Sequence, residues 1–159
     1  MTFDIHQIAD YFISKADANA GDLITHLKLQ KVVYYAQAWY LVLNDKELVE
    51  DEFEAWVHGP VVRVLYDRFQ GLGWHPITTE NPVTNPDDLP DDIKEFLNEV
   101  WDVYGQFGAK RLEDLTHDEL PWQEARNGLS PIQKCEKPIS KNTMKSFYRR
   151  KLVEENGKN

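Results

Sequence analysis

The chain has 159 residues, 27 of them acidic and 18 basic, which gives a formal net charge of -9. A chain of this length can bury enough apolar surface to fold as one domain without disulfides or a metal. Its acidic balance argues against general nucleic-acid binding, because such binding depends on neutralising phosphates. The single cysteine, Cys135, excludes a disulfide framework and a thiolate zinc cluster, and it favours a reducing, cytoplasmic location.

The N-terminal segment lacks the basic start and the apolar core of a secretory signal, so we expect no export. The longest apolar stretch, residues 32–43, is interrupted by Gln37 and falls short of the roughly 20 residues that span a membrane. This stretch is typical of a buried core helix, and we expect no membrane contact.

The charges are unevenly distributed along the chain. Carboxylates dominate residues 80–102, whereas lysine and arginine dominate residues 134–151. Solvated helix faces explain such a pattern most simply, but the two regions can also pair within the molecule, between the copies of a homodimer, or with a partner. A helix in the basic region 134–151 can contact phosphates, although the acidic remainder of the chain repels a polyanion.

The first two elements are predicted to be helices. Asp4 and Gln7 have the form of a capping box, which predicts a helix over 5–14. Thr25 can cap a long second helix that ends near Asn44. One arc of this helix is an apolar stripe of the kind that faces a core. Its members are Leu29, Val32, Val33, Ala36, Trp39, Tyr40 and Leu43.

The other arc of the second helix carries Tyr34, Tyr35 and Gln37. It is too apolar for plain solvent and too polar for a dry core. We therefore expect it to meet another element or a partner through tyrosine and amide hydrogen bonds.

Residues 45–58 mix acidic and large apolar side chains, which suits a short extended stretch or a hairpin. Gly59 and Pro60 mark a boundary, and Pro60 suits the first position of a helix over 60–70. Glycines and prolines then predict a long loop over residues 71–90, with a short strand near 76–79. Further helices are predicted over 91–107 and 109–115, as a short turn from Pro121, and from the N-cap Ser140 onward.

These patterns predict a mainly α fold. We expect a compact, single-domain, multi-helix bundle with a central buried helix and at most short β segments. The domain should span residues 1–155, and residues 156–159 should form a frayed tail.

Reactive side chains gather in the segment THDELPW. A metal-dependent hydrolase would recruit His117 and Asp118 together with His58 or His26. No HExxH pair fixes such a geometry, Cys135 has no nucleophile motif around it, and no glycine-rich phosphate loop is present. We therefore expect no catalytic residue, cofactor or metal, and the hydrolase remains an alternative of a different class.

Three stretches occur in a fixed order along the chain. They are LKLQKVVYYAQAWYLVL at 27–43, FEAWVHGPVVRVLY at 53–66, and a THxExPWxxAR pattern that begins at Thr116. Together they resemble the Panacea domain (SocA-like) family, and the resemblance covers nearly the whole chain.

The resemblance implies a bacterial or phage-encoded antitoxin. Its partner would be a cognate toxin, the product of an adjacent gene, neutralised by direct binding. The SocA type is instead a proteolytic adaptor that delivers its toxin to an ATP-dependent unfoldase-protease, and this role is the alternative. The family is not known for catalysis.

Aromatic residues held on rigid elements are efficient anchors of protein interfaces. We therefore expect toxin contacts on the polar arc of the second helix, at the Gly-Pro joint and around THDELPW. The candidate contact residues are Tyr34, Tyr35, Gln37, Trp56, His58, Gly59, Pro60, His117 and Trp122.

Overall fold

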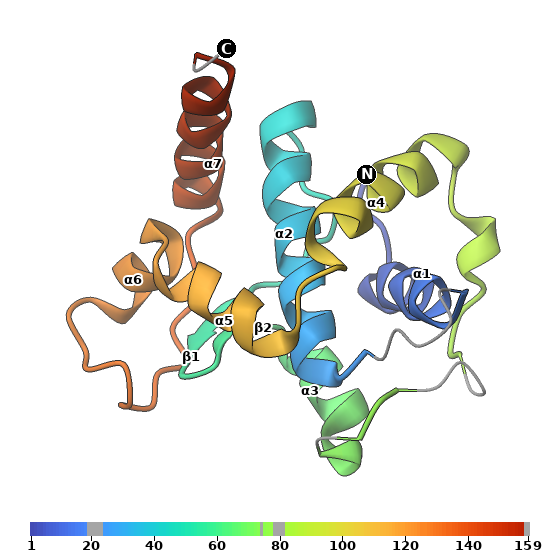
Figure 1. Ribbon diagram of the computed structural model, residues 1–159, viewed down its shortest axis with the longest axis horizontal. Coiled ribbons are helices and arrows are strands. Elements are labelled where there is room, and N and C mark those ends of the chain that lie inside the picture. The colour runs from blue at the N-terminus through green and yellow to red at the C-terminus, as the bar shows by residue number, and fades with distance from the viewer. Residues whose placement is uncertain (19–23, 74, 78–81, 158–159) are drawn as a thin grey trace.

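Figure 1 shows the computed structural model, which describes residues 1–18, 24–73, 75–77 and 82–157. Within these ranges the chain is mainly helical, as predicted, with one two-stranded sheet. The α-helices are α1 (Ile5–Ala18), α2 (His26–Asn44), α3 (Arg63–Phe69), α4 (Asp91–Tyr104), α5 (Ala109–His117), α6 (Leu120–Arg126) and α7 (Lys141–Asn156). The strands are β1 (Glu54–Trp56) and β2 (Gly59–Val61), and short 3-10 helices are η1 (Gln70–Leu72) and η2 (Pro86–Asp88).

Helix α2 is the centre of the fold, as its apolar stripe predicted. It packs against α1, α3, α4, α5, α7 and β2, and Figure 1 shows it between α7 and α1. The stripe is buried from Leu29 through Ala36, but Trp39 and Tyr40 are half-buried and Leu43 is 57% exposed. The prediction is wrong for Leu43 because the last turn of α2 borders an open groove.

The polar arc of α2 meets other elements of the chain, which was one of the two expected possibilities. The amide of Gln37 donates to the carbonyl of Val49 at 2.8 Å and accepts from the backbone N–H of Leu48 at 2.8 Å. The amide of Gln30 exchanges two hydrogen bonds with the backbone of Val62 in the same way. The two buried glutamines thus bind the backbone of the segments that follow α2 and β2, and the Val62 carbonyl also accepts from the backbone N–H of Tyr66.

The segment around Pro60 differs from the prediction. Residues 54–61 form an antiparallel hairpin in which Pro60 lies opposite Ala55, and α3 begins only at Arg63. Proline, which lacks a backbone N–H, suits the start of a helix. It suits equally a strand position that donates no hydrogen bond to the neighbouring strand. Here Gly59, with a φ of 103°, follows the two turn residues 57–58, and Gln30 holds the backbone of Val62 directly after the strand.

The predicted caps at Thr25 and Ser140 are confirmed, whereas several helix ends are not. The capping box of Asp4 and Gln7 does not form, because the Gln7 amide donates to the carbonyl of Asn85 at 2.9 Å. The hydroxyls of Thr25 and Ser140 each accept a hydrogen bond from the backbone N–H three residues later, at 3.3 and 3.2 Å. Helix α1 extends four residues beyond its predicted end to Ala18, and α4 ends at Tyr104. Helix α7 continues through Asn156, the first residue of the predicted tail.

The predicted loop over 71–90 contains η1 at its start and η2 near its end. The strand expected at 76–79 lies partly outside the described residues; within it, the backbone N–H of Ile77 donates to the carbonyl of Ile24 at 2.8 Å. No helix in the described ranges combines the length and the hydropathy that a bilayer crossing requires.

Candidate functional site

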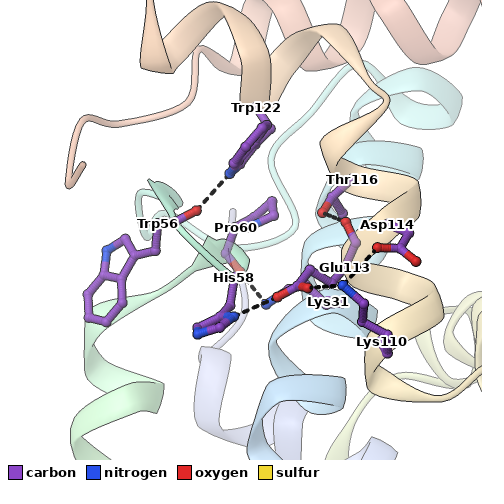
Figure 2. A network of polar contacts seen from close by, with 9 residues as sticks. All are labelled: Lys31, Trp56, His58, Pro60, Lys110, Glu113, Asp114, Thr116 and Trp122. Carbon is purple, nitrogen blue, oxygen red and sulfur yellow. Dashed lines mark hydrogen bonds and ion pairs between the residues drawn. The ribbon is translucent and has the colours of Figure 1, made fainter. Parts of the chain in front are cut away.

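The turn of the β1–β2 hairpin, the end of α5 and the start of α6 meet beside α2 (Figure 2). The indole N–H of Trp122 on α6 donates to the backbone carbonyl of Trp56 at 2.8 Å. This bond joins two residues that lie 66 positions apart in the sequence. We call the region the hairpin site. It gathers six of the nine candidate contact residues, namely Trp56, His58, Gly59, Pro60, His117 and Trp122.

Gly59 lies where the hairpin packs closely against α2 and α5. A Cβ added to it would lie 2.6 Å from Cε of Lys31 and 2.8 Å from Oγ1 of Thr116. Both distances are too short for a real side chain, and the φ of 103° is one that L-residues rarely adopt. Glycine at this position therefore lets three elements pack together.

Lys31 of α2 lies inside the hairpin site with 1% of its surface exposed. Its ammonium group donates to the carbonyl of Pro60 at 3.3 Å. Burial lowers the pKa of Lys31 to about 7, and the Glu113 carboxylate opposes this effect without cancelling it. Lys31 therefore changes its charge near neutral pH.

Glu113 of α5 connects this buried lysine to the surface. Its carboxylate lies 2.7 Å from Nδ1 of the exposed His58 and accepts from Nζ of Lys110 at 3.0 Å (Figure 2). Burial raises the pKa of Glu113, but the hydrogen bonds with Lys110 and His58 outweigh burial and lower it. Glu113 is thus the carboxylate that links the hairpin turn to α5.

The depressed pKa of Lys31 gives a prediction about stability and pH. Between about pH 7 and about pH 9 the unfolded chain keeps this lysine protonated, whereas the folded protein loses the proton. The unfolded state then binds more protons, so this residue makes the free energy of unfolding rise with pH, by about 2 kcal/mol over the interval.

Lys31→Met should remove this rise, as measured by urea denaturation at several pH values across the interval. The variant Lys46→Met, at an exposed position, is the control and should keep the wild-type slope. An unchanged slope in Lys31→Met would show that the folded protein keeps Lys31 charged.

The side chain of His117 packs against an aromatic ring. Its imidazole stacks on the indole of Trp122, with ring centroids 4.0 Å apart and planes 15° apart. The guanidinium of the buried Arg126 lies 4.8 Å from the same indole. Burial lowers the pKa of His117, which favours the neutral imidazole in this stack.

The geometry gives the hydrolase alternative no support. No group of three or more His, Cys, Asp or Glu side chains with the spacing of a metal site occurs within the described ranges. His58 contacts Glu113, His117 contacts Trp122, and the buried His26 lies 6.1 Å from the ring of Tyr66.

The remaining three candidates, Tyr34, Tyr35 and Gln37, are buried, with 1% or less of each residue exposed. The hydroxyls of Tyr35 and of Tyr148 on α7 both donate to one oxygen of Glu119, at 2.7 and 2.8 Å. Burial, reinforced by charged or hydroxyl neighbours that include Glu119, raises the pKa of both tyrosines. These candidates therefore lie below the surface and support the residues that are exposed there.

Sequence reasoning did not select three residues that hold the region together. Lys31 belongs to the stretch LKLQK and Glu119 to the pattern THxExPW, so both could have been selected from the sequence. Their burial, which the sequence does not show, is what marks them as residues that hold the fold. Glu113 belongs to no motif, and nothing in its sequence neighbourhood indicates its contact with His58.

The fold and this site define a small helical protein in which the residues of the sequence motifs fasten the helices to one another. The chain belongs to the family described as Antitoxin SocA-like, Panacea domain, whose model matches residues 29–123. The chain is also 32% identical over 137 residues to Antitoxin SocA of Caulobacter vibrioides (strain NA1000 / CB15N), which covers 79% of this chain and 71% of that protein. No solved structure matches the chain. The family predicted from the three stretches is confirmed.

Proposed function

We propose that this protein is a cytoplasmic antitoxin that neutralises a cognate toxin, the product of an adjacent gene, by binding it directly. The observation that carries the proposal is the 32% identity to a protein named an antitoxin, over 79% of the chain. Membership of the antitoxin family supports the same function.

The contacts of the ionisable groups favour binding over catalysis. Glu119 accepts from two tyrosines and pairs with Lys151 at 3.2 Å. Glu113 is engaged by His58 and Lys110, while His117 is stacked on an aromatic ring. A general base or a nucleophile needs access to a substrate, and Glu113 and Glu119 already have partners within the protein.

Within the hairpin site, the exposed His58 and the half-buried Trp56 are the residues that a toxin can reach. They border a hollow of about 360 Å³ together with Arg63 and Tyr66. Gly59, Pro60 and Trp122 are buried and hold this loop in place, so we assign them a supporting role.

Co-expression tests the function. In cells that express the adjacent gene's product, the wild-type protein should restore growth, and an empty vector should not. Growth arrest that persists while the protein accumulates in soluble form would contradict the proposal.

The adaptor alternative makes a different prediction about the toxin. An adaptor that delivers its toxin to an ATP-dependent protease shortens the toxin's half-life, whereas a simple neutraliser leaves it unchanged or longer. Pulse-chase measurement of the toxin, with and without this protein, distinguishes the two.

A further inference from the structure

A second surface lies outside the hairpin site, where the last turns of α2 run between α4 and α7. It is a groove of about 360 Å³. Positions 35, 39 and 43 of α2 follow one another at helical spacing along it, so one stripe of the helix forms its floor. We call it the α2–α4–α7 groove. Its main apolar and aromatic lining residues are Tyr35, Trp39, Leu43, Phe96, Val100 and Val103.

The rim of the groove exposes apolar side chains that the chain itself does not cover. Leu43 on α2 is 57% exposed and Val103 on α4 is 52% exposed. Single exposed apolar residues are common, but two that border one hollow form a continuous surface suited to a partner.

Aromatic contacts hold the floor of the groove in place. The ring of Tyr35 stacks on that of Tyr104, with centroids 4.0 Å apart and planes 5° apart. The indole N–H of Trp39 donates to the Tyr104 hydroxyl at 2.7 Å. A preformed surface reduces the entropy that binding would otherwise cost.

The charges at the groove are unbalanced. Glu99 of α4 and Glu155 of α7 line it, and neither forms an ion pair within the described part of the chain. Among the described residues, Lys151 is the one cation that lines the groove, and it is engaged with Glu119 at 3.2 Å. Arg150 lines an adjoining hollow instead of this groove. Further carboxylates, those of Glu95 and Asp102, are exposed on α4.

We propose that the α2–α4–α7 groove binds a basic amphipathic helix of the toxin. An apolar trough between helices accepts the apolar stripe of a helix at i, i+4 and i+7. The free carboxylates on both walls favour lysine or arginine beside that stripe. This inference rests on the proposed antitoxin function and adds to the hairpin site a second contact surface with an occupant of stated chemistry.

The location of the groove fits a specificity surface. Its charged and exposed wall residues Glu99, Val103 and Glu155 lie outside the three stretches that carry the family resemblance. The floor residues Tyr35, Trp39 and Leu43 belong to the first stretch, so the walls on α4 and α7 are the part of the groove that is left to match one particular toxin.

Affinity measurements with the full chain and the purified product of the adjacent gene test the proposal. Leu43→Lys and Val103→Lys should each weaken binding about tenfold or more, because a cation then faces the basic helix. Glu99→Lys should also weaken binding and reduce its dependence on salt. Val64→Lys on α3, at a residue 42% exposed and absent from the groove lining, is the matched control and should bind as the wild type does.

The outcomes separate this inference from the function on which it rests. Wild-type affinity in all three groove variants would overturn the groove as the toxin site and leave the antitoxin function standing. Absence of binding by the wild-type protein would contradict the proposed function itself. If the groove variants turn a dimer into a monomer in sedimentation and keep toxin affinity, the occupant is a second copy of this chain, and the inference is wrong.

Discussion

Gly59→Ala should lower the free energy of unfolding by about 3 kcal/mol. Part of the loss comes from the φ of 103°, where an L side chain is strained. The rest comes from the new Cβ, which would lie 2.6 Å from Cε of Lys31 and 2.8 Å from Oγ1 of Thr116. Both neighbours are buried, so they have little room to move away. Urea denaturation measures the change.

Gly71→Ala is the matched control for this substitution. Nothing lies within 4 Å of a Cβ added there, and the position has no positive φ. Its stability should stay within about 0.5 kcal/mol of the wild type. If Gly59→Ala is equally harmless, the hairpin does not approach α2 and α5 as closely as described.

Glu119→Ala should cost about 3 kcal/mol of stability, because it removes one buried acceptor from two buried donors. The hydroxyls of Tyr35 and Tyr148 would lose their charged partner, although Tyr148 keeps a contact with Tyr34 at 3.1 Å. Lys151 would lose its ion pair as well. Thermal or urea unfolding gives the value.

Glu119→Gln keeps an oxygen acceptor and should cost clearly less than Glu119→Ala. Glu124→Ala provides a control on α6, since this glutamate also accepts from a hydroxyl, that of Thr143, but is exposed. Its loss should stay below about 1 kcal/mol. Equal effects of the Glu119 and Glu124 truncations would mean that the tyrosine contacts contribute little to joining α2 and α7.

Features that depend on neighbouring residues could be predicted from the sequence. The caps at Thr25 and Ser140 are local hydrogen bonds, and the apolar stripe of α2 follows from helical spacing. Pro60 could not be placed, because a helix start and a strand both accept proline. The choice depends on Gln30, which pairs with the backbone of Val62 from 32 residues away.

The candidate site could be predicted in part for the same reason. Motif spacing indicated Trp56, His58 and Trp122, and the fold brings them together. Motif spacing did not distinguish residues that hold the fold from residues that a partner can touch. Tyr34 illustrates this, because its aromatic ring is typical of an interface anchor yet only 1% of the residue is exposed. Burial depends on the packing of α7 and the hairpin on α2, which the sequence of α2 does not contain.

The residues of the protein therefore fall into two sets, one that holds the fold and one that a partner can contact. The buried residues of the motifs, such as Lys31 and Glu119, fix the relative positions of α2, α5, α6 and α7. The α2–α4–α7 groove lies on this framework, and exposed residues such as Leu43 and Val103 supply its surface chemistry. A rigid framework with an adjustable surface suits a family whose members would each recognise their own toxin.

Direct binding is the central claim, and mixing the two purified proteins tests it most directly. The protein and the product of the adjacent gene should elute together in size-exclusion chromatography with light scattering, at the mass of a defined complex and with the toxin intact. Separate elution at concentrations where co-expression restores growth would contradict the claim, because neutralisation would then not depend on a stable contact between the two proteins.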